Sequence, residues 1–414
     1  MISKISSLEF NHIAKSGKSG PEPAGTESST AKSPQDRFCK ASPLTGIYSR
    51  PQTQESPQSR RVGKLRAQMA KQGLDGVLIT DPFNFRYFSG FTGDAGMLLI
   101  TPEARLLFTD SRFWEQARQE APEFDLVKNP AYGELNKHFK SGGKLGFEEK
   151  TLSVQSFENL KAALKADFKP VSSAIDDLRM IKDPEEISLL EKSIALNDRV
   201  FETVAPRIKP GASEKAVRAE IHYDLEKGGA QGPSFPAIVG AGANGALPHH
   251  TPDATKIREG DLVVVDMGGN LEGYCSDLTR TVMVGEVPEK AKEIYRVVAE
   301  AQQKAFDKIA PGVPIAEVDK AARDHIAKAG YGEYFGHSLG HGVGLEIHEA
   351  PAIYSRSQQK LEPGMVFTVE PGIYLPGFGG VRIEDVVVIT KDGYRILSHA
   401  KKQKPKTNKA ARRN

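Results

Sequence analysis

The sequence predicts an α+β fold of two domains, in which a smaller α/β domain precedes a domain of antiparallel strands flanked by helices. Three observations lead to this prediction. Residues 61–175 alternate short apolar strands with helical segments, which is typical of an α/β domain. Residues 183–329 place long helices between strands, and strands dominate from there to about residue 396. Elements mixed in that order favour helices packed against an antiparallel sheet.

Length and composition agree with two folded domains. A chain of 414 residues can form two full cores, and its apolar fraction of 39% and charged fraction of 26% are those of a soluble globular protein. No apolar run approaches the roughly 20 residues that a bilayer span needs, and the N-terminus lacks the apolar centre of a secretory signal. Two cysteines give no disulfide framework. We therefore expect a cytoplasmic protein without membrane contact.

The net charge of +3 is unevenly distributed. Residues 1–60 contribute +3 and residues 401–414 contribute +7, so residues 61–400 carry −7. Residues 1–60 hold too few large apolar side chains to offset the entropy cost of ordering, and they are predicted to form a disordered extension. Residues 398–414 are predicted to form a solvated basic tail. Because this tail lacks interleaved aromatic residues, nucleic-acid binding is not expected.

The smaller domain, residues 61–175, is predicted from hydrophobic periodicity and turn residues. Its expected elements are helices at 62–73, 110–120 and 154–166 and strands at 74–80, 96–101, 104–109 and 144–147. One aromatic group is expected in its core rather than in a binding site: Phe83, Phe85, Tyr87, Phe88 and Phe91.

The larger domain, residues 183–397, begins after a boundary near residues 176–183. There Pro184 and two glutamates open a long helix, as suits a helix N-terminus. Its expected elements are helices at 184–207, 213–228, 288–309 and 314–329 and strands at 235–241, 261–268 and 278–284.

Acidic residues stand beside apolar strands in the segment VVVDMGGNLEGYCSD, residues 263–277. The pattern is typical of a buried strand that delivers Asp266, a glycine-rich turn, and a return through Asp277. Two carboxylates side by side in a sheet repel and raise each other's pKa unless a cation neutralises them. Taken singly, Asp266 could cap a turn and Asp277 could pair with Arg280. Cys275 is expected to be a small core residue rather than a ligand.

Three later segments add His341 in GHSLGHGVG, Glu370 in VFTVEPGIY and Glu384 in VRIEDVVVIT. Glycines around His341 allow the backbone to approach a ligand closely. Glu370, before Pro-Gly, could instead close a turn. A carboxylate at position 384, among valines and isoleucines, is costly unless it is paired, whereas Asp385 would face the opposite side. Together, four carboxylates and one imidazole predict a site for two divalent cations such as Mn²⁺, Fe²⁺, Co²⁺ or Zn²⁺.

Other histidines lie near these segments. His249 and His348 could face a substrate without binding metal if their loops cross the site. For His337 and His250, structural hydrogen bonding or solvent exposure is the favoured alternative. His325, within a charged helix, is expected to be exposed.

Four motifs, DMGGNLEGYCSDLTRT, GHSLGHGVGLEIHEAP, VFTVEPGIY and VRIEDVVVIT, resemble those of the M24 metallopeptidases. This pita-bread family includes methionine aminopeptidase, aminopeptidase P and prolidase. The segments NFRYFSGFTGDAG and LFTDSRFWEQA are similar to the creatinase-type N-terminal domain, which methionine aminopeptidases lack. The resemblance covers residues 61–397 and implies a pita-bread catalytic domain that cleaves Xaa-Pro bonds.

The resemblance also implies roles for individual residues. The implied ligands of two divalent metal ions, with Mn²⁺ expected and Co²⁺, Zn²⁺ or Fe²⁺ as alternatives, are Asp266, Asp277, His341, Glu370 and Glu384. The implied catalytic residues are Glu370 as general base and His348 and His249 at the oxyanion. The implied substrate contacts are Arg382, His337 and Tyr374. His250 departs from the family, since relatives often carry Gly or Tyr there.

The function expected from this resemblance is an Xaa-Pro aminopeptidase, a dinuclear-metal exopeptidase that acts on peptides with proline in second position. The alternative is a prolidase restricted to Xaa-Pro dipeptides. A non-catalytic pita-bread binding protein and a metal-free creatinase are disfavoured because all five implied metal ligands are present. The family further implies a homodimer.

Overall fold

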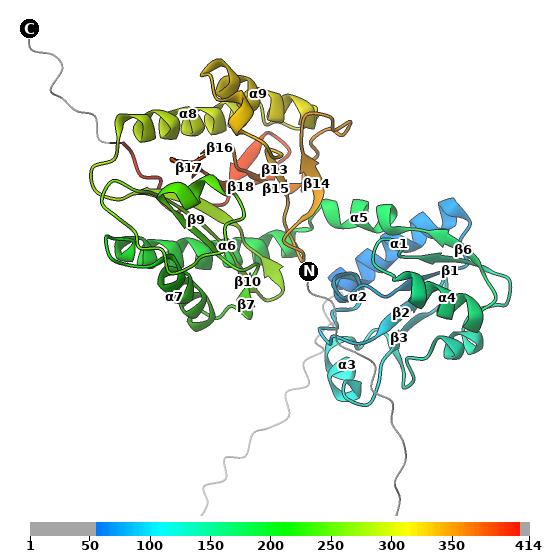
Figure 1. The fold of residues 1–414 in the computed structure, drawn as a ribbon. Coiled ribbons are helices and arrows are strands. Elements are labelled where there is room, and N and C mark those ends of the chain that lie inside the picture. The colour runs from blue at the N-terminus through cyan, green and yellow to red at the C-terminus, as the bar shows by residue number, and fades with distance from the viewer. Residues whose placement is uncertain (1–54, 406–414) are drawn as a thin grey trace, which may run out of the picture. The chain divides into compact units, whose positions relative to one another are not determined.

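A computed structural model describes residues 55–405 of the chain (Figure 1). Residues 1–54 and 406–414 lie outside the described residues, and with them most of the predicted N-terminal extension and the end of the predicted basic tail. The boundary of that extension is wrong by a few residues, because helix α1 (Pro57–Gln72) already contains residues 57–60. Ser56 caps this helix through a 3.0 Å hydrogen bond from the Ser59 amide, and Pro57 occupies its first turn.

The N-terminal domain is built on one mixed six-stranded sheet of order β4-β3-β2-β1-β5-β6. Its strands are β1 (Gly76–Ile79), β2 (Met97–Ile100), β3 (Arg105–Phe108), β4 (Asp125–Val127), β5 (Lys144–Phe147) and β6 (Asp167–Pro170). Its helices are α1, α2 (Pro82–Ser89), α3 (Trp114–Glu120) and α4 (Val154–Ala163). Strands β1, β2 and β3 pair antiparallel, and β4, β5 and β6 add in parallel. The predicted aromatic group is buried in this domain's core except for Phe83, which is 39% exposed.

The boundary between the domains is helical. Helix α5 (Ser172–Met180) leads to helix α6 (Pro184–Val204), which begins at a capping box of Asp183 and Glu186. Arg61 of α1 donates a 2.8 Å ion-paired hydrogen bond to Asp183. The predicted boundary near residues 176–183 therefore falls across the end of α5 and the start of α6.

The C-terminal domain contains two helix pairs and four small antiparallel sheets. Its remaining helices are α7 (Glu214–Lys227), α8 (Glu289–Phe306) and α9 (Ile315–Lys328). Strands β11-β10-β7 and β12-β9-β8 form two three-stranded sheets, β14-β13-β15-β18-β19 form a five-stranded sheet, and β16-β17 pair alone. Their bounds are β7 (Gly232–Pro233), β8 (Ile238–Ala241), β9 (Leu262–Met267), β10 (Gly269–Leu271), β11 (Tyr274–Cys275), β12 (Leu278–Met283), β13 (Gly340–Gly342), β14 (Glu349–Ile353), β15 (Val366–Val369), β16 (Gly372–Leu375), β17 (Gly379–Arg382), β18 (Asp385–Ile389) and β19 (Tyr394–Ile396).

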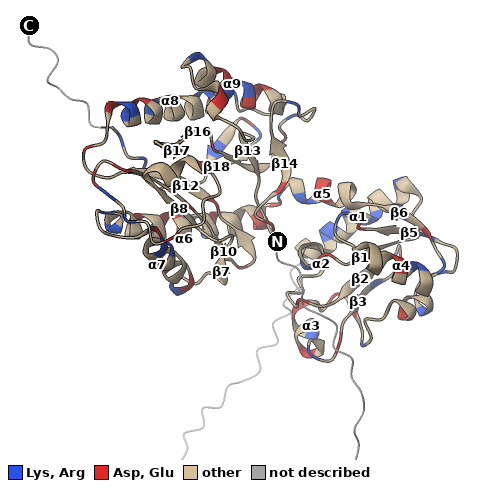
Figure 2. Cartoon of the chain, viewed as in Figure 1, with Lys and Arg blue, Asp and Glu red and all other residues tan. Residues whose placement is uncertain are grey.

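Helices cover the C-terminal strands from two sides (Figure 1). The pair α8–α9 lies on one side of strands β16 and β17, and the pair α6–α7 lies on the other side, against β8, β10 and β11. Figure 2 shows acidic and basic residues along these helices, whereas most of the strand surface between them is neither. No helix within residues 55–405 is long and apolar enough to cross a membrane.

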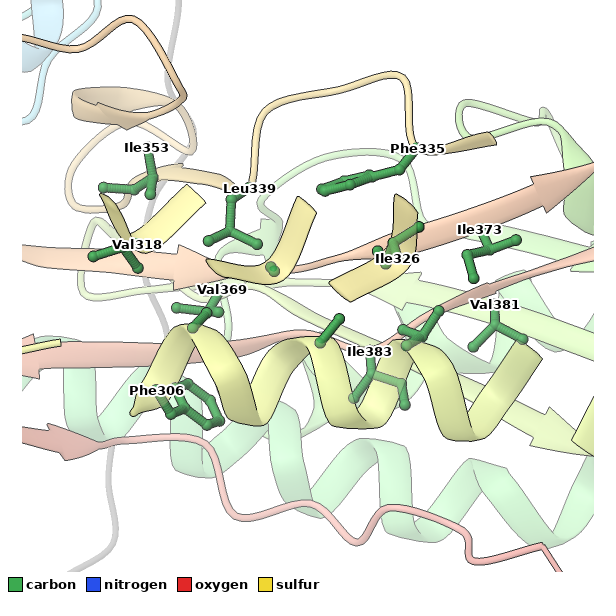
Figure 3. Close-up of a cluster of buried hydrophobic side chains, with 14 of the residues drawn as sticks. Phe306, Val318, Ile326, Phe335, Leu339, Ile353, Val369, Ile373, Val381 and Ile383 are labelled. Carbon is green, nitrogen blue, oxygen red and sulfur yellow. The ribbon is translucent and has the colours of Figure 1, made fainter. Parts of the chain in front are cut away.

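The strands that lead to the predicted ligands rest on a large hydrophobic cluster (Figure 3). Val369 and Ile383 are fully buried in this cluster together with Phe306 of α8. Burying such a side chain contributes about 1.5–3 kcal/mol. Because neighbouring residues of an extended chain point to opposite sides, this burial directs Glu370 and Glu384 away from the helices.

The segment that follows the last strand is not a free tail. Ala400 is 4% exposed, and its carbonyl accepts hydrogen bonds of 2.7 and 3.1 Å from Arg280. Lys402 forms a 2.5 Å ion pair with the buried Asp385, and Gln403 accepts a 2.6 Å hydrogen bond from the Met283 amide. The prediction of a solvated tail from residue 398 is therefore wrong for residues 398–403, because their backbone and side chains complete a buried polar network.

Candidate active site

One cavity of about 560 Å³ contains all ten residues that the sequence singled out for ligand, catalytic or substrate roles. These residues are Asp266, Asp277, His341, Glu370, Glu384, His249, His348, His337, Tyr374 and Arg382. They come from segments spread over more than one hundred positions, so only the tertiary structure brings them together.

Two acidic residues come from the paired strands β9 and β12. The register sets Thr279 opposite Asp266, so Asp277 lies two positions farther along the same strand face. The predicted hairpin is thus present, but the two carboxylates are diagonal neighbours rather than direct partners. The intervening residues form β10 and β11, which join β7 in a separate sheet.

His341 lies in the short strand β13, where the register with β14 shifts between His341 and Gly342. Its Nδ1 lies 3.1 Å from the Gly342 carbonyl oxygen, which fixes Nδ1 as the proton-bearing atom and leaves Nε2 free to act as a ligand. Nε2 lies 3.3 Å from Glu370 and 3.5 Å from Asp277.

The glycines that flank His341 are required by close contacts. A Cβ at Gly340 would stand 1.9 Å from the Thr368 carbonyl oxygen, and one at Gly342 would stand 2.2 Å from the Ala350 carbonyl oxygen. Such approaches of backbone to backbone exclude any side chain at either position. The sequence predicted that these glycines let the backbone approach a ligand closely, whereas the close contacts in the structure are with the backbone of Thr368 and Ala350.

Glu370 follows β15 and Glu384 precedes β18, and each carboxylate accepts a hydrogen bond from a threonine. The Thr368 hydroxyl donates a 3.0 Å hydrogen bond to Glu370, and the Thr279 hydroxyl donates a 2.8 Å hydrogen bond to Glu384. These threonines orient the carboxylates toward the cavity.

The four carboxylates are crowded and lack sufficient partners within the described chain. Burial raises the pKa of Asp277 and of Glu384 well above the usual range, and the neighbouring carboxylates raise both pKa values further. Oδ1 of Asp266 and Oε1 of Glu384 are buried without a hydrogen-bond partner among the described residues. Oxygen atoms that are buried, unpaired and close to an imidazole are the donor set that divalent transition-metal ions prefer, so the residues fit the predicted cations.

Arg382, Tyr374 and His337 form a hydrogen-bonded chain along the cavity wall. Arg382 donates hydrogen bonds to Asp266 at 2.7 Å, to the Thr279 hydroxyl at 3.0 Å and to the Tyr374 hydroxyl at 2.9 Å. The Tyr374 hydroxyl lies 2.9 Å from Nε2 of His337. Burial raises the pKa of Tyr374 to about 12, so this phenol is neutral and donates its proton along the chain.

The predicted oxyanion histidines lie on the open side of the cavity. His348 and His249 are both exposed, and the ring of His348 stands edge-on to the ring of His341 with 4.3 Å between centroids. Partial burial lowers the pKa of His348, and the charge of His341 lowers it further. The His348 ring is therefore neutral near pH 7 and can donate one hydrogen bond.

His250 makes the structural hydrogen bond that was the favoured alternative for it. Its Nε2 lies 2.7 Å from Oε2 of Glu214, a fully buried residue at the start of α7. Glu214 also accepts hydrogen bonds from the Ala241 amide and from the Asn244 side chain, at 2.8 and 3.0 Å. Glu214, His250 and Asp253 form a second cluster of residue types that can bind a metal ion. Because N–H donors already occupy both Glu214 oxygens, we regard this group as an anchor for the loop that carries His249.

Two single-residue alternatives from the sequence are settled by the structure. Arg280 does not pair with Asp277: it forms a 2.8 Å ion pair with Asp385, which faces away from the cavity as predicted. His325, which was expected to be exposed, is partly buried: its side chain is 26% exposed and lies 3.1 Å from Glu300. Cys275 is 4% exposed and does not line the cavity, in agreement with a core residue.

The sequence analysis missed several polar residues of the site, notably Thr279, Thr368, Glu214 and Arg218. The two threonines carried a usable signal, since Thr279 follows Asp277 by two positions and Thr368 precedes Glu370 by two, which is the period of one strand face. Glu214 and Arg218 are four positions apart on α7 and carried no comparable signal.

Comparison with known proteins shows which family the two domains match. The profile of metallopeptidase family M24 matches residues 188–391, and the profile of the creatinase/prolidase N-terminal domain matches residues 61–181. An Xaa-Pro dipeptidase of Pyrococcus furiosus is 40% identical over 83% of this chain and 99% of its own length.

Solved structures give the same picture. The chain is similar to an Xaa-Pro dipeptidase from Bacillus anthracis, with a TM-score of 0.81, 42% identity and coverage of 84% of this chain and 99% of that one. It is also similar to an X-Pro aminopeptidase from Thermotoga maritima, with a TM-score of 0.77, 37% identity and coverage of 83% and 98%.

Proposed function

Since the chain belongs to metallopeptidase family M24, with a creatinase-type N-terminal domain before the pita-bread domain, we propose that it hydrolyses Xaa-Pro dipeptides. The observation that carries this proposal is the convergence of four carboxylates and one imidazole in one cavity, with buried oxygen atoms left unpaired. Family membership establishes a metallopeptidase that uses divalent metal ions. The substrate length, the native metal and the roles of single residues belong to the proposal.

We assign two cations to Asp266, Asp277, His341, Glu370 and Glu384, and Mn²⁺ is the first choice, with Co²⁺, Zn²⁺ and Fe²⁺ as alternatives. When bound, such ions supply Lewis-acid polarisation of the scissile carbonyl and lower the pKa of water.

Glu370 is the proposed general base. Its Oε1 accepts the Thr368 hydroxyl and lies beside His341, whereas its Oε2 makes no hydrogen bond with another described residue. A carboxylate held through one oxygen can take a proton on the other and deliver it to the leaving proline nitrogen. His348 and His249, on the open side, donate hydrogen bonds to the oxygen that becomes negative during attack.

Arg382 is proposed to hold Asp266 in place while it also shapes the wall near the substrate. It is 3% exposed and three of its donors are already used, so it neutralises part of the carboxylate cluster. Tyr374 and His337 extend this hydrogen-bonded chain to the cavity surface, where they remain our proposed substrate contacts.

The length of the substrate distinguishes a prolidase, which cleaves Xaa-Pro dipeptides, from an Xaa-Pro aminopeptidase, which cleaves longer peptides. The relatives from Pyrococcus furiosus and Bacillus anthracis are both named Xaa-Pro dipeptidases, which favours the prolidase reading over the aminopeptidase reading expected first. The similarity to an X-Pro aminopeptidase keeps longer peptides as the alternative.

The test compares Ala-Pro with Ala-Pro-Ala after removal of metal and addition of Mn²⁺, Co²⁺ or Zn²⁺. We expect hydrolysis of Ala-Pro that depends on added metal and much slower hydrolysis of the tripeptide. Equal or faster cleavage of the tripeptide would establish the aminopeptidase alternative. If neither peptide is cleaved with any of the metals, Xaa-Pro hydrolysis is the wrong function.

A further inference from the structure

Arg218 is a cation of the cavity that the proposed chemistry does not use. It lies on α7, is partly buried, and lines the same cavity as the predicted ligands. The lining also includes Phe235, Pro236 and Pro248, next to His249. Arg218 therefore lines the same cavity as an apolar wall and the proposed oxyanion residue His249.

Two arginines line this cavity among the described residues, and they differ in their hydrogen bonding. Arg382 donates to Asp266, Thr279 and Tyr374. Arg218 makes no ion pair and no side-chain hydrogen bond with any residue in the range 55–405. A guanidinium that is partly withdrawn from water and has no protein partner is suited to a ligand anion.

The residues one helical turn before and after Arg218 do not pair with its guanidinium. Glu214, one turn earlier, is occupied by N–H donors from Ala241, Asn244 and His250. His222, one turn later, accepts a 3.2 Å hydrogen bond from the Ala237 amide through Nε2 and so is neutral. Burial lowers the pKa of His222, and the nearby charge of Arg218 lowers it further.

A dipeptide with proline in second position presents two features on its leaving side, a pyrrolidine ring and a free carboxylate. The ring matches the wall of Phe235, Pro236 and Pro248, and the carboxylate needs a cation that is not already paired. A longer peptide or an amide carries no charge at that point. We propose that Arg218 binds the C-terminal carboxylate of the substrate and thereby selects dipeptides, an inference that rests on the proposed Xaa-Pro hydrolysis.

The test uses Arg218→Ala, the conservative variant Arg218→Lys, and Lys215→Ala as a control that removes an exposed charge from the same helix. Each protein is assayed with Ala-Pro and with Ala-Pro carboxamide, which has the same scissile bond and no carboxylate. We expect Arg218→Ala to lower kcat/KM for Ala-Pro by about 10- to 100-fold, mainly through KM, as the loss of a charged hydrogen bond predicts. The carboxamide should change by less than about twofold, Arg218→Lys should recover part of the loss, and Lys215→Ala should match the wild type.

Binding of L-proline and of L-prolinamide to each protein, measured by calorimetry, gives a readout that needs no turnover. We expect tighter binding of proline than of prolinamide in the wild type, and loss of that preference in Arg218→Ala. An equal loss of activity on both substrates, or an unchanged preference for proline, would overturn the assignment of Arg218. If the wild type cleaves no Xaa-Pro substrate but keeps an Arg218-dependent preference for proline, the proposed hydrolysis fails and the carboxylate site stands.

Discussion

At the scale of single residues, the site is a balance between buried negative charge and a small number of fixed donors. Thr279, Thr368 and Arg382 each donate a hydrogen bond to one carboxylate. They do not neutralise four acids, since Asp277 and Glu384 retain raised pKa values. The metal-free protein therefore stores repulsion that bound cations remove.

Asp277→Asn tests this balance. The raised pKa of Asp277 means that its ionised form destabilises the metal-free fold, and the loss of stability grows as pH rises above the pKa of the unfolded chain. At pH 7.5 with a chelator, we expect the variant to unfold at the same or a higher temperature than the wild type. Added Mn²⁺ should raise the melting temperature of the wild type but not of the variant, and turnover should fall at least about 100-fold. A chelated variant that melts well below the chelated wild type would contradict this account.

The buried Cys275 thiol is predicted to react slowly with alkylating reagents in the native protein. Burial raises the pKa of its thiol to about 11 from the model-compound value of 9.0, which lowers the thiolate fraction near pH 8 by about 100-fold. We expect an alkylating reagent at pH 8 to leave Cys275 unmodified in the native protein and to modify it after unfolding, as peptide mass spectrometry would show. Rapid native labelling at this position would place the thiol at the surface instead.

At the scale of elements, short strands set the position of the proposed ligands because each strand is held by its neighbours on both sides. Strand β13 is three residues long, yet it pairs with β14 on one side and β15 on the other. Its close contacts with Thr368 and Ala350 hold His341 between Asp277 and Glu370. The glycines of this strand therefore determine where His341 lies among the proposed ligands.

Gly340→Ala, compared with Gly336→Ala, tests the role of β13. The added Cβ at position 340 meets the Thr368 carbonyl at 1.9 Å, whereas position 336 has nothing within 4 Å. We expect a loss of about 1–3 kcal/mol in the free energy of unfolding for Gly340→Ala, together with weaker metal binding, and little change for Gly336→Ala. Urea denaturation and metal titration measure both effects. Equal behaviour of the two variants would show that β13 tolerates displacement.

At the scale of the whole molecule, the last described residues complete the catalytic domain. Arg280 of β12 is buried between the Asp385 carboxylate and the Ala400 carbonyl. Lys402 forms the second ion pair of Asp385. The expected homodimer is not addressed by these intrachain contacts, and it stays a prediction that light scattering of the purified protein can check.

Two truncations separate the packed segment from the residues beyond it. Removing residues 398–414 takes away the Ala400 carbonyl that accepts from Arg280 and the Lys402 ammonium that pairs with Asp385. The Arg280–Asp385 ion pair remains, and we expect a loss of about 1–3 kcal/mol, because buried polar groups lose hydrogen-bond partners. Removing only residues 406–414 should leave the stability unchanged within about 0.5 kcal/mol. Chemical denaturation compares the two. A stable protein that ends at residue 397 would refute the importance of this segment.

Much of the fold and of the candidate site could be predicted from the sequence. The long helices and the strands beside Asp266 and Asp277 follow from local periodicity, and their bounds differ from the prediction by a few residues where caps such as Ser56 were not recognised. The ligand set followed from residue chemistry, since acids among valines need a cation or another partner. The order of helices and strands was informative because each pattern depends on neighbouring residues.

The sequence by itself determined which side chains can bind cations and which segments bury apolar surface, because both properties are local. Only the tertiary structure decided that Arg280 pairs with Asp385 rather than Asp277, that Thr279 stands opposite Asp266, and that Arg218 faces the cavity without a partner. Strand register and ion pairing join residues far apart in the chain, and their energies depend on packing around both partners.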